Sequence, residues 1–202
     1  MAAPGNPRWT NAARHGSYRH PEAGSAGYPA GSSRAPFGAL PRDRPENHES
    51  DESDMTTPRI LIIDARFYDD IADALLAGAT EVLEGHGADV TRISVPGVLE
   101  IPAALAMALA AMESGQADFD GFVLLGCVIR GETSHYDIVA NESARAVMEL
   151  VIDAALPLGN GILTVENREQ AWARADVQQK NKGGAAAQAA LDMIAVRDRL
   201  GV

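Results

Sequence analysis

The chain has 202 residues, a formal net charge of -11 at pH 7 and a hydrophobic content of 46%, which together allow one globular domain with an additional segment. The strong negative charge argues against a nucleic-acid-binding surface, and no apolar run is long enough to make this a membrane-spanning protein. A single cysteine excludes an internal disulfide, so we expect a cytoplasmic protein.

Residues 1–54 differ in composition from the rest of the chain. They contain seven of the eleven prolines and almost no aliphatic residues. Such a segment cannot bury enough apolar surface to offset the entropy lost on ordering. We therefore expect a disordered N-terminal extension over residues 1–54 and a single globular domain over residues 55–202.

Apolar runs alternate with helical patterns from Arg59 onward. A strand followed by a helix, repeated four times, predicts a parallel sheet with helices on both faces. The expected fold is therefore an α/β protein, a three-layer α/β/α sandwich around a four-stranded parallel sheet. The predicted strands are 60–63, 90–95, 120–127 and 161–165, and the predicted helices are 71–84, 103–112, 136–155, 168–175 and 185–200.

The expected capping residues are Asp69 or Asp70 for the first helix and Asn167 for the fourth. In a parallel sheet, the loops that follow the strands meet at one edge, and ligands bind there. We therefore expect the chemistry in the loops 66–68, 96–100 and 128–135 and at the start of the helix that follows Asn167.

The stretch from Gly126 to Tyr136 runs from a buried strand through a polar loop into a helix. Backbone N–H groups at a helix N-terminus attract anions, and the same dipole disfavours a cationic imidazole. A neutral His135 could then accept a proton during a reaction. The alternative is an ordinary loop in which Ser134 caps the helix, and the spacing alone favours neither reading.

Three other side chains each permit two interpretations, and a fourth permits one. Glu100 could accept hydrogen bonds from a polyol or simply begin a helix, and Phe67 could stack on a planar ring or pack in the core. Arg174 could clamp a phosphate or be a surface charge. Cys127 lies in an apolar run, and no feature nearby would lower its pKa, so we expect an inert buried thiol. The expected domain contains two histidines and no metal-ligand spacing, so we predict no metal site.

Five motifs in order resemble the lumazine synthase family. They are GCVIRGETSHYD at 126–137, VPGVLEIP at 95–102, GILTVEN at 161–167, QAWARA at 170–175 and NKG at 181–183. The resemblance runs from about Arg59 to the C-terminus and implies a flavodoxin-like sandwich. It also implies the penultimate step of riboflavin biosynthesis, which condenses 5-amino-6-(D-ribitylamino)uracil with 3,4-dihydroxy-2-butanone 4-phosphate. The products are 6,7-dimethyl-8-ribityllumazine, phosphate and water, and no metal or organic cofactor takes part.

The resemblance further implies a role for each site residue. His135 transfers protons. Glu132 and Thr133 give backbone or hydroxyl donors to the phosphate, and Arg174 clamps it. The pyrimidine ring and its ribityl chain are bound by a larger set, in which Phe67 stacks on the ring, Glu100 accepts from the ribityl hydroxyls and Lys182 comes from a neighbouring subunit. The other members of that set are Val98, Leu99, Val128, Ile129 and Asn160.

Three places depart from the pattern of the family, one of them Ala185, where an acidic residue is frequent. Many members have an aromatic residue over the pyrimidine where this chain has Gly159 and Asn160. Asn160 either hydrogen-bonds the substrate instead or leaves its affinity lower. The connector 176–180 lacks the glycine-rich form typical of members that build sixty-subunit shells, so we expect a homopentamer, with a decamer or a 60-mer as the alternatives.

The sequence leaves three functional hypotheses. The first is the enzyme, the second is a non-catalytic flavin- or lumazine-binding oligomeric module, and the third is a purely structural oligomer. A binding module without turnover would be expected to have lost His135 or Arg174. Both are present, together with Phe67 and Glu100, and this favours the enzyme.

Overall fold

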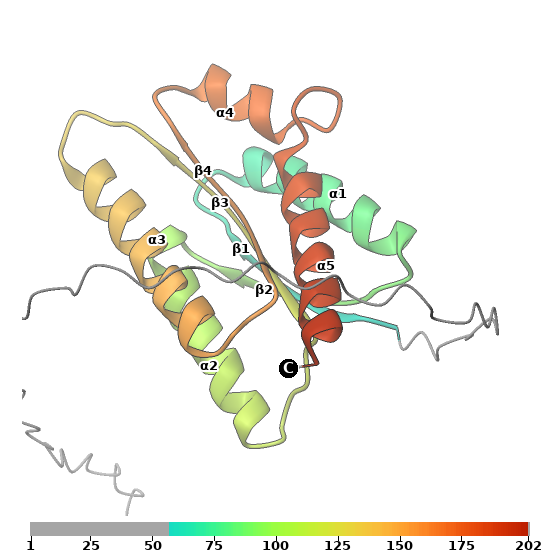
Figure 1. Ribbon diagram of the computed structural model, residues 1–202. Coiled ribbons are helices and arrows are strands. Elements are labelled where there is room, and N and C mark those ends of the chain that lie inside the picture. The colour runs from blue at the N-terminus through green and yellow to red at the C-terminus, as the bar shows by residue number, and fades with distance from the viewer. Residues whose placement is uncertain (1–56, 202) are drawn as a thin grey trace, which may run out of the picture. The chain divides into compact units, whose positions relative to one another are not determined.

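Four parallel strands form the centre of the domain (Figure 1). The computed structural model describes residues 57–201, so the predicted disordered extension lies outside the described residues. The strand order is β2-β1-β3-β4, which places β2 and β4 at the edges. The predicted four-stranded parallel sheet is thereby confirmed, with bounds β1 (Arg59–Ala65), β2 (Asp89–Val95), β3 (Gly121–Ile129) and β4 (Leu158–Val165).

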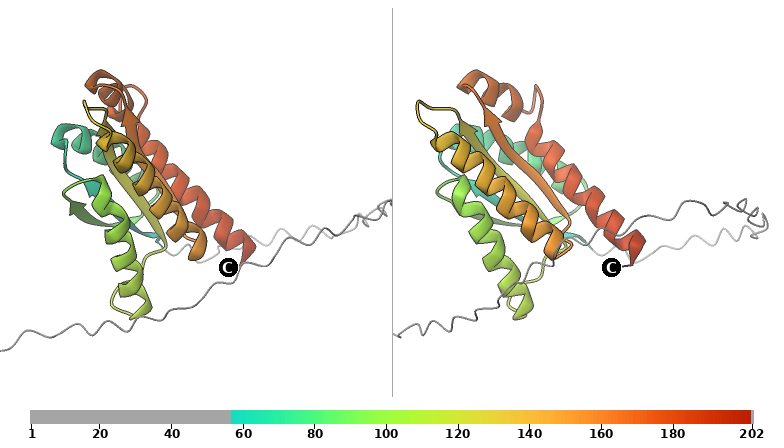
Figure 2. Two further views of the ribbon diagram at one scale, coloured as in Figure 1. Left: turned by 90° about the vertical axis from the view of Figure 1, so that its left-hand side faces the viewer. Right: turned by 60° about the vertical axis from the view of Figure 1, so that its left-hand side comes forward.

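Helices cover both faces of this sheet, as the two side views in Figure 2 show. One face carries α1 (Asp69–Gly85), α4 (Arg168–Ala175) and α5 (Lys182–Leu200). The other carries α2 (Ile101–Glu113), which follows the 3-10 turn η1 (Val98–Glu100), and α3 (His135–Asp153). The fold is therefore the expected flavodoxin-like α/β/α sandwich. None of the helices described between residues 57 and 201 is both long and apolar enough to cross a bilayer.

The central strands are apolar throughout because both of their faces are buried. On β1, Ile60 and Ile62 pack toward α1 and α5, whereas Leu61 and Ile63 pack toward α2, and all four side chains are fully buried. Edge strand β2 differs from the prediction of a buried strand, since most of its residues are exposed. It has a neighbour on one side only and little helix cover, so polar side chains are tolerated there.

Small residues allow α5 to approach α1 closely. A Cβ atom on Gly183 would lie 1.9 Å from the carbonyl oxygen of Leu75, and one on Gly78 would lie 2.0 Å from Oδ1 of Asn181. Asn181 has a φ of 40°, and its Oδ1 accepts a hydrogen bond from the Gly184 N–H at 3.0 Å. This capping starts α5 at Lys182, three residues before the predicted start, and fixes the backbone of that lysine.

Two further boundaries differ from the predictions. Asp69 and Asp70 are not caps but lie inside the first turn of α1, where their charge suits the helix dipole. Strand β4 begins at Leu158, so Asn160 lies within a strand rather than in the preceding loop. The predicted cap at Asn167 is confirmed, because its side chain accepts from the Gln170 N–H at 2.9 Å.

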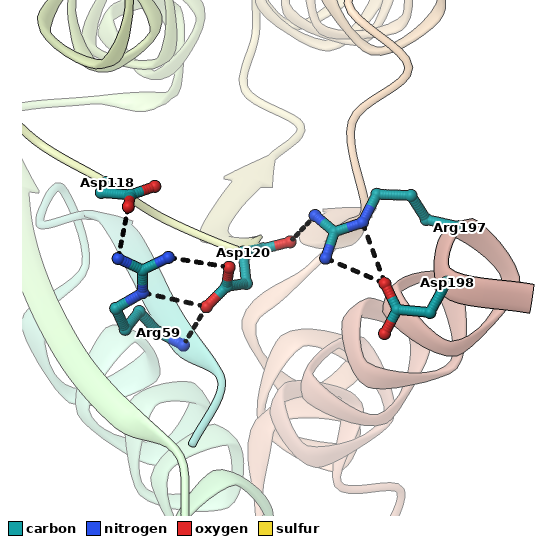
Figure 3. A network of polar contacts seen from close by, with 5 residues as sticks. All are labelled: Arg59, Asp118, Asp120, Arg197 and Asp198. Atoms are coloured by element: carbon teal, nitrogen blue, oxygen red, sulfur yellow. Dashed lines mark hydrogen bonds and ion pairs between the residues drawn. The ribbon is translucent and has the colours of Figure 1, made fainter. Parts of the chain in front are cut away.

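An ionic network lies at the amino-terminal ends of the strands, which we call the amino-terminal edge of the sheet (Figure 3). The Arg59 guanidinium donates to both carboxylate oxygens of Asp120, at 3.0 and 3.1 Å, and also pairs with Asp118. From α5, Arg197 donates to the backbone oxygen of Asp120 at 3.0 Å and pairs with Asp198. The starts of β1 and β3 and the end of α5 are thus tied together.

Candidate active site

A pocket of about 350 Å³ lies at the carboxyl-terminal edge of the sheet, between the β1–α1 loop, η1 and the β3–α3 loop. We call it the first pocket. Its position follows from the parallel topology, which brings the ends of β1 and β3 together. It gathers eight of the predicted site residues, namely Phe67, Val98, Leu99, Glu100, Val128, Ile129, Thr133 and His135.

Phe67 is presented to solvent rather than packed in the core. Its side chain is 71% exposed, and its ring meets the Tyr68 ring edge-on at a centroid distance of 4.9 Å. Opposite this loop, Glu100 is exposed at the end of η1, while Val98 is buried beneath it. The core-packing interpretation of Phe67 is therefore wrong, and the ring is free to contact a ligand.

The β3–α3 loop places an imidazole at the start of a helix. His135 is the first residue of α3 and is exposed. Ser134 occupies the N-cap position but makes no side-chain capping hydrogen bond, so the capping role considered for it is wrong. The Thr133 hydroxyl instead accepts from the His135 N–H at 3.4 Å. Glu132 is exposed and lines neither this pocket nor the second one described below.

Arg130 supplies the positive charge in this loop, but its guanidinium is already bonded. It donates to Glu166 at 2.8 Å and to Asp137 at 3.3 Å, and it lies 3.9 Å from the centroid of the Tyr136 ring. These contacts hold the loop to the end of β4 and to α3. The loop is therefore fixed in place by Arg130, a role that the motif alone did not reveal.

A second pocket, of about 330 Å³, lies between edge strand β4, α4 and the start of α5. Asn160, Arg174 and Lys182 line it. Arg174 donates to the backbone oxygen of Gln170 at 3.0 Å. Within residues 57–201, neither Arg174 nor Lys182 has a carboxylate partner. Two cations without counter-charges make this hollow suitable for an anion.

The residues predicted to bind phosphate are not brought together within one protomer. Thr133 lines the first pocket and Arg174 lines the second. Among the described residues, none lines both pockets. One chain therefore presents the predicted site as two separate sets of residues.

Cys127 borders the first pocket but is 7% exposed, and burial raises its pKa to about 12. The predicted burial of this thiol is confirmed, and burial disfavours the reactive thiolate. Tyr68, Tyr136 and Val139 also line the first pocket. Both tyrosines lie within the segments expected from the sequence, without an assigned role, whereas Val139 was missed. Helical spacing could have revealed Val139, four residues after His135 on the same face of α3. In the part of the chain described here, no group of acidic, histidine or cysteine side chains is placed to hold a metal ion.

Comparisons with known proteins agree on one family. Residues 57–198 match the family model described as 6,7-dimethyl-8-ribityllumazine synthase. The 6,7-dimethyl-8-ribityllumazine synthase of Agrobacterium fabrum (strain C58 / ATCC 33970) is 60% identical over 147 residues, which cover 73% of this chain and 99% of the relative. The 6,7-dimethyl-8-ribityllumazine synthase 1 of Rhizobium meliloti (strain 1021) is 63% identical over 142 residues, which cover 70% of this chain and 93% of the relative. The similarity thus spans the described domain and nearly the whole length of both relatives.

Proposed function

Because this chain belongs to the 6,7-dimethyl-8-ribityllumazine synthase family, we propose that the first pocket of one subunit and the second pocket of a neighbour together form each active site. The enzyme condenses the ribitylaminouracil with the butanone phosphate in riboflavin biosynthesis. The observation that carries the proposal is the separation of the predicted site residues into two sets. A reaction between two substrates needs both sets at one place.

In the first pocket, we assign the pyrimidine substrate to the exposed ring of Phe67 and to the turn η1. Phe67 stacks on the pyrimidine ring, and Glu100 accepts hydrogen bonds from the ribityl hydroxyls, while Val98 and Leu99 line the chain. Backbone groups of Val128 and Ile129 contact the ring. The exposure of the Phe67 ring and the position of Glu100 on the pocket wall support these roles.

In the second pocket, Arg174 binds the phosphate, together with backbone or hydroxyl donors of Thr133 and Glu132 of the neighbouring subunit. Lys182 reaches the ribityl chain and the ring. The side-chain Oδ1 of Asn160 accepts a hydrogen bond from the Ile162 N–H at 3.0 Å. The side-chain NH₂ group is therefore the part that can donate to the substrate. Asn160 thus replaces an aromatic face with a hydrogen-bond donor.

The reaction needs proton transfers more than it needs strong electrophiles. The amine attacks the ketone, water leaves to give an imine, and phosphate departs. The ribitylamino nitrogen then attacks the remaining carbonyl, and the ring closes with loss of a second water. His135, exposed in the first pocket at the start of α3, moves the protons between these steps. Arg174 stabilises the departing phosphate by fixed positive charge. No metal or organic cofactor takes part in this scheme.

We propose a homopentamer formed by the domain at residues 55–202, located in the cytoplasm, with a decamer or a 60-mer as the alternative assemblies. Large apolar side chains on α2 and α3 support the assembly, since Met107, Ile138 and Ile152 are 71%, 53% and 71% exposed. Exposed apolar side chains of this size are typical of faces that another chain covers. Light scattering of the purified full chain would measure the mass of the assembly.

Mixed oligomers test whether the active site is shared. One variant carries Glu100→Ala and His135→Ala in the first pocket, and the other carries Arg174→Ala in the second. We expect each to form lumazine slowly when assembled alone. In oligomers assembled from equal amounts of both variants, random mixing restores about one quarter of the interfaces, because an intact first pocket then meets an intact second pocket.

Lumazine absorbance after addition of both substrates is the measurement. Two samples serve as controls: the same variants assembled separately and then combined, and a mixture in which both variants are altered in the first pocket. Neither control regenerates an intact interface. Activity of the mixed oligomers no higher than that of these controls would mean that each chain builds a complete site.

A further inference from the structure

One arginine fixes the loop that carries Phe67. The Arg66 guanidinium donates to Asp73 at 2.7 Å and to Asp69 at 3.0 Å, and it lies 3.6 Å from Asp64. Asp69 and Asp73 lie on α1, whereas Asp64 lies on β1. Arg66 therefore joins the strand before the loop to the helix after it, and Phe67 is the next residue in the chain.

Asp64, one of the three partners of Arg66, is itself held firmly in place. Its carboxylate is fully buried and accepts two hydrogen bonds from Arg92, both at 2.8 Å, and one from the Ser94 hydroxyl at 2.9 Å. Arg92 and Ser94 lie on β2, which pairs with β1. The guanidinium of Arg66 thus rests against a carboxylate whose position is set by two strands.

Phe67 itself has little that would hold its position. Its ring contacts Tyr68 and is otherwise largely exposed. The backbone on either side is bonded, since the Arg66 N–H donates to the Val95 oxygen at 2.9 Å and the Tyr68 oxygen accepts from the Ala72 N–H at 2.9 Å. The place of the ring is therefore set by the backbone beside it and by the side chain of Arg66.

We infer that Arg66 is a positioning residue for the pyrimidine substrate, acting by holding the Phe67 ring over the first pocket. Arg66 does not line that pocket, so its effect passes through Phe67. The inference rests on the proposed stacking of Phe67 on the pyrimidine ring. The competing interpretation is that the Arg66 pairs contribute to stability alone.

The substitution Arg66→Met is suited to this question because it leaves no buried charge unpaired. Asp64 keeps its bonds from Arg92 and Ser94, and the side chains of Asp69 and Asp73 are 75% and 66% exposed. We therefore expect the variant to fold and assemble. Arg66→Lys is the conservative variant, which keeps the charge but not the planar fork that reaches several carboxylates.

A double-mutant cycle in the full-length, assembled enzyme distinguishes the two interpretations. KM for each substrate is measured in the wild type, Arg66→Met, Phe67→Ala and the double variant. We expect Arg66→Met to raise KM for the pyrimidine about three- to tenfold, the size of a lost aromatic stacking contact, with less effect in Arg66→Lys. KM for the butanone phosphate should stay within about twofold. In the Phe67→Ala background, removing Arg66 should change neither KM further.

Arg59→Met is the matched control, because Arg59 also pairs with two carboxylates but lies at the other edge of the sheet. It should lower the midpoint of unfolding without changing either KM. An Arg66→Met enzyme with an unchanged pyrimidine KM, or with the same increase in both backgrounds, would overturn the positioning role. A Phe67→Ala enzyme with a normal pyrimidine KM would instead overturn the proposed stacking, so the two failures are distinguishable.

Discussion

Two groups of cations, at opposite ends of the strands, differ in whether their charges are paired within the chain. At the amino-terminal edge, Arg59 and Arg197 are bonded to carboxylates and to a backbone oxygen, and Asp120 connects them (Figure 3). At the carboxyl-terminal side, Arg174 and Lys182 line an open pocket and have no carboxylate partner among the described residues. Arg59 and Arg197 are thus satisfied within the chain, whereas Arg174 and Lys182 remain available to a ligand.

This difference separates stability from binding. A paired arginine contributes to folding and has little capacity left for a ligand, whereas an unpaired cation in a hollow contributes little to folding and can bind an anion. Substitutions of the unpaired cations Arg174 and Lys182 should therefore change kinetic constants and leave unfolding nearly unchanged. Substitutions at the amino-terminal edge should do the reverse.

The largest expected effect is at Arg174. In Arg174→Ala, kcat/KM for the butanone phosphate should fall about 100-fold, because a charge-assisted contact with the phosphate is lost. KM for the pyrimidine should change little. The midpoint of unfolding should also change little, since Arg174 makes one hydrogen bond, to a backbone oxygen of its own helix.

Steady-state assays with each substrate varied in turn measure this effect. Arg199→Ala is the control, because Arg199 is an exposed arginine near the far end of α5 and lines neither pocket. A loss of pyrimidine affinity alone in Arg174→Ala would show that the assignment of Arg174 to the phosphate is wrong.

A smaller effect is expected at His135. In His135→Ala, kcat should fall about tenfold, less than is usual for general acid–base catalysis, because much of the acceleration comes from positioning the two substrates. His135 is exposed and its side chain makes none of the hydrogen bonds found in the described domain, so the protein should unfold at the same denaturant concentration. Single-turnover lumazine formation measures the chemical step. A wild-type rate in the variant would remove the catalytic role.

The local parts of this fold could be predicted from sequence. The apolar runs of β1 and β3 and the loop motif from Gly126 to Tyr136 carry their own signals, because burial on both faces and the strand-to-helix change are local patterns. The exposure of β2 could not be predicted, since it follows from the position of that strand at the edge.

The resemblance placed Lys182 on a neighbouring subunit, but the sequence pattern did not separate Asn160 and Arg174 from the other site residues. Strand order places β4 at the opposite edge from β2, so Asn160 and Arg174 lie in a different pocket from Phe67. The positioning role of Arg66 was not predicted either, because its partners Asp64 and Asp73 become neighbours only when β1 and α1 are packed together. Both features depend on contacts between elements, which spacing along the chain does not encode.

The smallest effect is expected at the amino-terminal edge and appears in stability. Asp120→Asn should lower the free energy of unfolding by about 1 kcal/mol at pH 7, the upper range for a partly exposed ion pair. Both KM values should stay at those of the wild type. Measurements by denaturant unfolding need one fixed protein concentration, because the stability of an oligomer depends on concentration.

The difference in the free energy of unfolding between wild type and Asp120→Asn should depend on pH if it comes from the charge of Asp120. The hydrogen bond from Arg59 holds the pKa of Asp120 below its usual value. Asp120 therefore contributes fully to stability above its pKa in the unfolded chain, which is about 3.9. This contribution is lost as the pH falls through the lower pKa that Asp120 has in the folded protein. The difference in the free energy of unfolding between wild type and Asp120→Asn should therefore become smaller below about pH 4. Asp64 is present in both proteins and cancels in the comparison. A gap of equal size at pH 7 and pH 3 would show that the network stabilises the edge by packing and not by charge.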